Sequence, residues 1–174
     1  MAKKNQKKVL TKKELYKKIK DVKLVLTDND GVLTDTGVYY SSKGEELKRF
    51  SIRDGMGVER LNKICGIQTG IITGEISGSV KKRAEKLKIE NLFLGVKEKH
   101  LILPKIIKKN KLKLENVAYI GDDINDIEII KLVGISACPS DAMQEIKSIV
   151  NYVCKNKGGN GAFREFAELI IKYH

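Results

Sequence analysis

The sequence is short of the residues that carry several common chemistries. Its 174 residues include no tryptophan, two prolines, two histidines and three cysteines. Cys65, Cys138 and Cys154 are far apart and odd in number, which disfavours both a disulfide framework and a thiolate metal site. With only His100 and His174 to act as a base, serine or cysteine hydrolase chemistry is poorly supported. Widely spaced thiols fit a reducing compartment, so we expect a cytoplasmic location.

Long hydrophobic runs are also missing. No stretch approaches the roughly 18 apolar residues that cross a bilayer, and the Lys-rich start lacks the apolar segment of a secretion signal. We therefore expect no membrane association. Apolar residues still make up 41% of the chain, which is enough for one folded domain with a real core.

Positive charge is concentrated at one end of the chain. The formal net charge is +12, and residues 1–20 contain nine lysines against the single acidic residue Glu14. Thr11 and Glu14 have the spacing of a capping box, which predicts a short helix. We therefore divide the chain into a basic N-terminal arm with a short helix (1–20) and a single domain (21–174). Nucleic-acid binding through the arm is an alternative that we do not favour, because Lys runs at chain ends are most often solvated.

From residue 21 onward, short apolar segments alternate with longer segments of helical periodicity. This pattern is typical of repeated βα units around a parallel sheet. It predicts an α/β, Rossmann-like doubly wound fold with a mostly parallel sheet. The expected strands are 23–27, 67–72, 91–94, 117–120, 134–137 and 149–153. The expected helices are 57–64, 77–87, 99–109, 125–132, 141–146 and 162–173.

One segment departs from the alternation. Residues 37–40 and 47–52 are rich in β-prone side chains, and residues 41–45 between them resemble a hairpin turn. This β-hairpin flap would follow the first strand at the carboxyl edge of the sheet, where such folds bind ligands. We expect it to serve as a flap or as an assembly element. The remaining intervals are too short for a separate cap domain.

Two carboxylates directly follow the first expected strand. Asp28 and Asp30 are two residues apart and precede Gly31, so both side chains can point into one crevice at the edge of the sheet. A pair of aspartates in an ordinary turn is the simpler interpretation. If the pair is catalytic, Asp28 can attack phosphorus as a carboxylate and form an acyl phosphate. Asp30 can donate a proton to the leaving oxygen and later accept one from water.

Further polar residues follow the later strands. Thr73 and Gly74 offer a hydroxyl and backbone N–H groups that can hold phosphate oxygens. Lys99 can neutralise phosphate charge, although a lysine in so basic a chain is often only solvated surface. Carboxylates that face Asp28 repel it unless a cation lies between them, and an all-oxygen ligand set favours Mg²⁺. The acidic residues that follow a later strand are Asp122, Asp123 and Asp126.

The order of these motifs resembles the haloacid dehalogenase superfamily of aspartate-nucleophile phosphatases. The motifs are D-x-D-G at 28–31, T-G at 73–74, Lys99, and G-D-D-x-x-D at 121–126. Segments 30–35 (D-G-V-L-T-D), 53–57 (R-D-G-M-G) and 158–165 (G-G-N-G-A-F-R-E) are similar to capless 3-deoxy-D-manno-octulosonate 8-phosphate phosphatases and to the related nonulosonate 9-phosphate phosphatases. The resemblance covers the chain from residue 22 to the last helix.

The resemblance implies a small acidic sugar phosphate as substrate and roles for individual residues. By position, Asp28 is the nucleophile and a Mg²⁺ ligand, and Asp30 is the acid and base whose carbonyl binds the metal. Asp122 is the third protein ligand, and Asp123 and Asp126 lie behind the ligands. The two residues expected to hold the transferred phosphate are Thr73 and Lys99.

The resemblance also implies a homotetramer. In it the hairpins pack together, and the neighbouring subunit covers the active site. The glycine-rich tail at 158–165 either reaches into a neighbour's site or is a flexible connector to the last helix.

Different motifs indicate different sugar substrates. Octulosonate enzymes usually carry Arg after the T-G pair, where this chain has Glu75, and Glu75 with Lys86 is similar to the nonulosonate pattern. Arg53 in the R-D-G segment is instead similar to the octulosonate type. Glu75 can accept hydrogen bonds from sugar hydroxyls, or it can simply favour a helix N-terminus. A lipopolysaccharide sugar and a sialic-acid-like sugar therefore both stay open as products. The expected substrate-binding residues are Arg53, Gly74, Glu75, Lys86 and Arg164.

A non-catalytic phosphoacceptor module of the receiver type is the remaining alternative. Receivers also place Asp, Thr and Lys around Mg²⁺ in a doubly wound sheet. Their acidic pair comes before the acceptor, however, whereas the cluster at 121–126 comes last in this chain. A receiver also needs a long-lived phosphoaspartate, whereas Asp30 can act as a base that promotes its hydrolysis.

Overall fold

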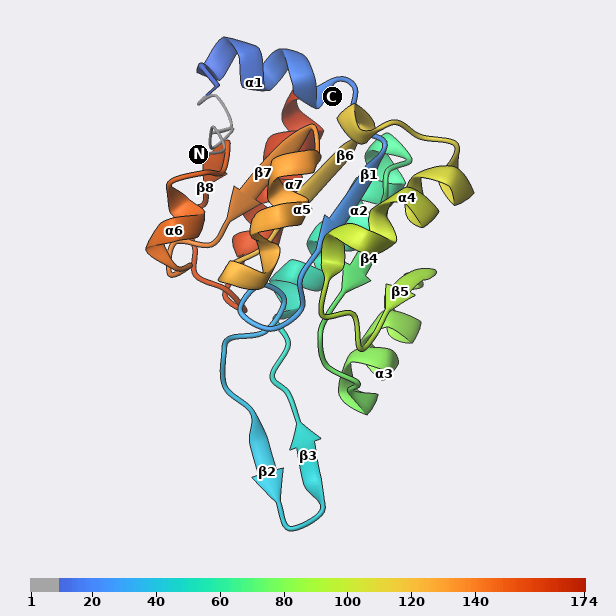
Figure 1. Cartoon of the computed structure of the whole chain (residues 1–174), viewed down its shortest axis with the longest axis vertical. Coiled ribbons are helices and arrows are strands. Elements are labelled where there is room, and N and C mark those ends of the chain that lie inside the picture. The colour runs from blue at the N-terminus through green and yellow to red at the C-terminus, as the bar shows by residue number, and fades with distance from the viewer. Residues whose placement is uncertain (1–9) are drawn as a thin grey trace, which may run out of the picture.

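The computed structural model describes residues 10–174, in which a parallel sheet is covered by helices on both faces (Figure 1). The strands are β1 (Leu24–Thr27), β4 (Gln68–Ile72), β5 (Asn91–Phe93), β6 (Val117–Ile120), β7 (Ile135–Cys138) and β8 (Tyr152–Val153). Their order is β5-β4-β1-β6-β7-β8, and every neighbouring pair is parallel. The predicted α/β, Rossmann-like doubly wound fold is confirmed.

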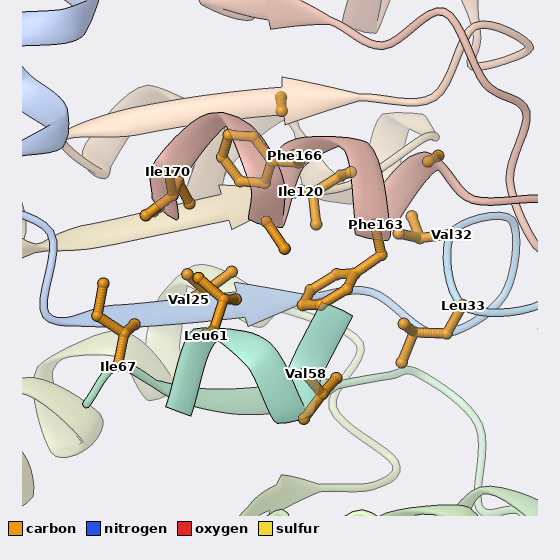
Figure 2. Close-up of a cluster of buried hydrophobic side chains, with 14 of the residues drawn as sticks. Val25, Val32, Leu33, Val58, Leu61, Ile67, Ile120, Phe163, Phe166 and Ile170 are labelled. Carbon is orange, nitrogen blue, oxygen red and sulfur yellow. The ribbon is translucent and has the colours of Figure 1, made fainter. Parts of the chain in front are cut away.

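The central strands β1, β6 and β7 are buried on both faces, so their side chains alternate between two cores. In β1, Val25 joins a core formed with α2 and α7, where Phe163 points toward β1 (Figure 2) and Phe166 also contributes to the core. Leu24 and Leu26 join the core on the opposite face. The helices of the first core are α1 (Lys12–Ile19), α2 (Ile52–Cys65), α3 (Gly78–Lys86) and α7 (Ala162–Tyr173). Those of the second are α4 (Lys99–Asn110), α5 (Ile127–Leu132) and α6 (Gln144–Lys147).

Helix α7 is capped by a residue from another helix. Its own N-cap, Gly161, has no side chain and a φ of +106°. The buried carboxylate of Asp54 in α2 accepts the N–H groups of Gly161 (3.0 Å) and Arg164 (2.9 Å) instead. A Cβ at Gly57 would lie 3.1 Å from the Cα of Arg164, so the glycine lets the two helices approach closely. The R-D-G-M-G segment and the glycine-rich tail, both similar to one family, therefore pack directly against each other.

The predicted N-terminal helix is confirmed as α1. The Thr11 side chain accepts the N–H of Glu14, and the Glu14 carboxylate accepts the N–H of Thr11, which completes the capping box. Tyr16 stacks on Tyr173 of α7 with ring centroids 3.7 Å apart. This part of the predicted arm therefore packs on the body of the protein. Residues 1–9, which hold the first lysines of the arm, lie outside the described residues.

The hairpin is present with different bounds. Its strands are β2 (Tyr39–Ser41) and β3 (Gly44–Leu47), so the expected second strand at 47–52 was wrong. Residues 52–56 belong to α2, which begins earlier than expected because Ser51 caps it by accepting the N–H of Asp54 (3.3 Å). The hairpin projects from the end of the sheet where β1 points (Figure 1). Within residues 10–174 the chain forms no separate cap domain, and none of its helices is long and apolar enough to cross a membrane.

Candidate active site

The loop after β1 holds Asp28 in a fixed position. The Asp28 N–H extends the sheet by donating to the carbonyl of Ile120 (2.9 Å). Its carboxylate is 5% exposed, and Oδ1 accepts the N–H of Asn29 (2.6 Å). Gly31 has a φ of +84°, and a Cβ there would lie 2.0 Å from the Asp122 carboxylate. Only glycine suits this position, because it permits both the backbone conformation and the close approach of Asp122.

Lys99 lies directly behind Asp28. It starts α4, is fully buried, and places Nζ 2.6 Å from Asp28 Oδ2 and 2.7 Å from Asp126 Oδ1. Burial alone would lower the pKa of Lys99, but the charges of Asp28 and Asp126 outweigh it and raise that pKa. The side chain is thus a permanent ammonium group in contact with the candidate nucleophile. Lys99 is therefore not a solvated surface lysine.

Asp126 organises the loop after β6. One carboxylate oxygen accepts from Lys99 and from the Tyr119 hydroxyl (2.5 Å). The other accepts the N–H groups of Asp122 (2.9 Å) and Asp123 (3.4 Å). Both oxygens are therefore used by the protein itself. Asp126 is the last residue of the short 3₁₀ turn η2 (Ile124–Asp126).

Three carboxylates are crowded together at this point. Asp28, Asp122 and Asp126 each offer an oxygen within 4.8 Å of the others. Burial, followed by the charges of neighbouring carboxylates, raises the pKa of Asp28 to about 7 and that of Asp122 to about 8. Among the described residues, Asp122 Oδ1 is buried without a hydrogen-bond partner. An orphaned carboxylate oxygen beside a second carboxylate fits a hard divalent cation, which would relieve the repulsion.

A small cavity opens in front of these carboxylates. Its volume is about 220 Å³. It brings together seven of the predicted site residues: Asp28, Asp30, Thr73, Gly74, Glu75, Asp122 and Asp123. Thr73 is 1% exposed, and its hydroxyl accepts the N–H of Glu75 (3.2 Å), which leaves the hydroxyl hydrogen to donate. The other lining residues are Thr36 and Asn125.

Three predicted sugar-binding residues do not line this cavity. Lys86 lines a larger cavity of about 610 Å³, beside Gln68 at the start of β4, whereas Thr73 follows the end of that strand. Arg53 is exposed on the first turn of α2. Arg164 is on α7 and donates to Glu168 (2.8 Å). Within one chain, Glu75 is therefore separated from its expected partner Lys86.

The glycine-rich tail packs on the nucleophile loop of its own chain. The Gly159 N–H donates to the carbonyl of Val32 (2.9 Å), and a Cβ at Gly158 would lie 1.9 Å from the carbonyl oxygen of Gly31. Arg49 donates both to Gly159 O (3.3 Å) and to the carboxylate of Asp35 (2.7 Å). The tail is therefore not a flexible connector. It supports the loop that carries Asp28 and Asp30.

Sequence reasoning missed several residues around the site. Lys48 contacts Asp30, Tyr119 contacts Asp126, and Asp54 caps α7. In a chain with 34 lysines and arginines, no pattern distinguishes Lys48 from its neighbours. Tyr119 looked like one more apolar position of a strand. Asp54 lies in the R-D-G motif that resembles the family, but no sequence spacing predicts that a residue of one helix caps another helix.

The fold and the site together define an aspartate-based hydrolase. Strand β1 delivers Asp28 and Asp30, and later strands deliver Thr73, the buried Lys99 and the acidic loop, in the order of haloacid dehalogenase-like hydrolases. The model of that hydrolase family matches residues 95–166. The chain belongs to the 3-deoxy-D-manno-octulosonate 8-phosphate phosphatase family of these hydrolases, as the relatives below show.

The phosphatase of that name from Haemophilus influenzae is 36% identical over 91% of this chain and 87% of its own length. The one from Escherichia coli K12 is 35% identical over 91% and 84%. Among solved structures, the Moraxella catarrhalis phosphatase in complex with magnesium, phosphate and KDO superposes with a TM-score of 0.90, at 36% identity and 94% coverage of both chains. The cobalt-bound Haemophilus influenzae phosphatase superposes with a TM-score of 0.87, at 36% identity over 90% and 91%. The receiver and nucleic-acid alternatives find no support among these proteins.

Proposed function

We propose that this chain is a Mg²⁺-dependent phosphatase that hydrolyses the terminal phosphate of a 3-deoxy-2-ulosonic acid phosphate, first of all 3-deoxy-D-manno-octulosonate 8-phosphate. The observation that carries the proposal is the position of Asp28, buried at the base of a small cavity between Lys99 and Asp122. The relatives at 35–36% identity support the substrate class.

In the first step, an Asp28 oxygen attacks phosphorus and the bond between phosphorus and the sugar oxygen breaks. Asp30 gives its proton to that leaving oxygen. The Thr73 hydroxyl donates to a phosphate oxygen, and the Lys99 ammonium offsets negative charge in a loose transition state. The products of this step are the free sugar acid and an acyl phosphate on Asp28.

In the second step, Asp30 takes a proton from water, and the resulting hydroxide attacks phosphorus. The bond between phosphorus and Asp28 breaks, which releases inorganic phosphate and restores both carboxyl groups. Asp28 and Asp122, with the carbonyl of Asp30, would hold Mg²⁺. The bound cation would supply positive charge to the phosphate and keep the nucleophile ionised.

Magnesium should stabilise the chain more at high pH than at low pH. In the metal-free chain, the folded-state pKa values of Asp28 (about 7) and Asp122 (about 8) lie above the ordinary value, so the folded state holds these protons more tightly than the unfolded state does. Their contribution to stability is complete below about pH 4 and is lost as the pH rises through these values. Mg²⁺ binds the ionised carboxylates of Asp28 and Asp122. The stabilisation by Mg²⁺ therefore increases as the pH rises through the pKa values of these two groups.

The test is calorimetric unfolding with Mg²⁺ or with chelator at a fixed metal concentration. At about 100 times the Kd at pH 8.5, we expect about 2.7 kcal/mol of stabilisation, or roughly 5–10 °C in Tm. At pH 6 we expect less than half of that increment. Equal increments at both pH values would contradict the proposed metal site.

A nonulosonate 9-phosphate is the second candidate substrate, and the presence of Glu75 in the cavity favours it. The test is phosphate release from the two substrates side by side. We expect octulosonate 8-phosphate to lead by about 100-fold in kcat/KM, which is about 2.7 kcal/mol. In either case Glu75→Ala should lower kcat/KM about tenfold or more, since a hydrogen bond to a charged group contributes about 1.5–3 kcal/mol. Glu90→Ala, in the other cavity, is the matched control and should change nothing.

We further propose that the chain assembles into a homotetramer through its hairpins. Tyr39, Tyr40 and Leu47 are each more than 60% exposed, and Ile52 and Ile76 are more than 80% exposed. A two-stranded hairpin is marginally stable alone, and exposed large apolar side chains on it favour a protein interface. Such packing would let a neighbour cover the cavity and bring residues such as Arg53 or Lys86 toward another subunit's site. A monomer in sedimentation velocity would contradict this assembly.

We place the enzyme in the cytoplasm. All three cysteines are free, and burial raises the pKa of Cys138 to about 12. Such thiols are inert structural residues that persist in a reducing compartment.

A further inference from the structure

The base of the hairpin contains a buried ammonium group. Lys48 directly follows β3, and its side chain is only 1% exposed. Its Nζ lies 2.5 Å from Asp30 Oδ1 and 3.3 Å from Glu45 Oε2. A lysine this deeply buried needs such partners, because removing its charge from water is costly. Lys43 at the hairpin tip is exposed instead, and its backbone N–H donates to Ser41 Oγ (3.1 Å).

Glu45 ties the same group to the phosphate-binding side of the site. Its Oε1 accepts the hydroxyl of Ser77, which is the N-cap of α3. Ser77 comes four residues after Thr73. We call Glu45, Lys48 and Ser77 the hairpin clasp. The clasp joins β3, the loop that carries Asp30, and the start of α3.

The contacts of Asp30 are all on one side of its carboxylate. Within residues 10–174, Oδ1 accepts from Lys48, from Asn29 Nδ2 (3.1 Å) and from the Thr34 hydroxyl (3.4 Å). Each of these donors fixes the same oxygen. Oδ2 is therefore the oxygen left to carry the proton, and Asp30 lines the cavity beside Asp28.

We propose that Lys48 is a positioning residue for proton transfer: by holding Oδ1 of Asp30, it aims Oδ2 at the oxygen that leaves phosphorus. Lys48 acts through Asp30 and moves no proton itself. The role rests on the proposed phosphatase function, in which Asp30 protonates the leaving alcohol. It also links the geometry of the acid to the hairpin, because Glu45 and Lys48 belong to the hairpin and its base.

Leaving groups of different basicity separate this role from simple stabilisation. A sugar alkoxide is a poor leaving group that needs the proton, whereas p-nitrophenolate leaves without it. The value of kcat/KM depends only on the steps up to and including the first irreversible one, which is the departure of the leaving group. The later attack of water on the acyl phosphate therefore does not affect it. Lys48→Met keeps the length of the side chain and removes its donors.

We expect Lys48→Met to lower kcat/KM for octulosonate 8-phosphate by about 100-fold, the lower end of general-acid effects. For p-nitrophenyl phosphate we expect less than about a threefold change. Lys48→Arg keeps the charge and should recover part of the activity on the sugar phosphate. Lys43→Met is the matched control and should behave as the wild type with both substrates. Circular dichroism and thermal unfolding confirm that the variants are folded.

Each other outcome is decisive. An equal loss with both substrates would show a merely structural role and overturn the proposal, as would no loss with either. If Lys48→Met does not fold, Lys48→Arg decides the question. Its kcat/KM should then fall more for octulosonate 8-phosphate than for p-nitrophenyl phosphate. A wild-type enzyme that hydrolyses p-nitrophenyl phosphate but no sugar phosphate would overturn the proposed function and the clasp together. A wild type active on the sugar phosphate without selective loss in Lys48→Met would overturn the clasp alone.

Discussion

We expect Asp28→Asn to abolish turnover and to leave the fold intact. Asparagine has nearly the same shape but its amide cannot attack phosphorus to form an acyl phosphate, and loss of a catalytic nucleophile typically costs at least about 10⁴-fold in kcat. The N–H of Asn29 can still donate to the side-chain oxygen at position 28. Steady-state phosphate release measures the loss. Asp21→Asn, an exposed substitution outside the site, is the control.

The same variant should not be less stable than the wild type without metal. Burial and the charge of Asp126 raise the pKa of Asp28, so ionising Asp28 works against folding at pH 8. Removing that charge relieves the crowding with Asp122 and Asp126, and Lys99 keeps its buried ion pair with Asp126 (2.7 Å). Thermal unfolding at pH 8 in chelator should therefore show a Tm equal to or above that of the wild type. Activity within tenfold of the wild type would contradict the assignment of Asp28 as nucleophile.

We expect Lys99→Met to lower both the stability and the activity. It leaves Asp28 and Asp126 buried without their shared cation, and breaking a buried ion pair costs about 3–5 kcal/mol of stability. For a chain of this size that is roughly a 10 °C fall in Tm. Loss of one group that stabilises transition-state charge should lower kcat by a further 10²–10³-fold, about 3–4 kcal/mol. Lys97→Met, on the exposed turn before α4, should do neither.

A second substitution separates the two effects of Lys99. In Lys99→Met/Asp126→Asn, one of the two stranded charges is gone, and the new amide can still pair with the Tyr119 hydroxyl and with the N–H of Asp122. Much of the lost stability should return, whereas activity should stay low. Recovery of activity together with stability would show that Lys99 is only a structural residue.

Much of the fold was predictable from the sequence because the central strands β1, β6 and β7 are short and buried on both faces. The strand at 117–120 was predicted at its observed bounds, and the last helix at 162–173 as well. The strand ends were equally informative, because Asp28, Thr73 and Asp122 follow β1, β4 and β6. The carboxyl ends of parallel strands meet at one edge, so motifs far apart in sequence meet in one cavity.

The rest depended on contacts that have no local pattern. The start of α2 was missed because Phe50 and Ile52 are β-prone and Ile52 is 82% exposed, which hides the helical period. Lys48 is one lysine among many until the hairpin places it on Asp30. Lys86 matched a family pattern, yet in one chain it lines a different cavity from Glu75.

In the proposed mechanism, the phosphate group is transferred to Asp28 before water releases it. Rapid acid quench of the wild type with ³²P-labelled octulosonate 8-phosphate and Mg²⁺ should trap label on the protein, and peptide mapping should find it at Asp28. The label should disappear on a chase with unlabelled substrate at least as fast as kcat, and Asp28→Asn should trap none. Label at Asp30, or turnover without any trapped or chaseable label, would contradict the account.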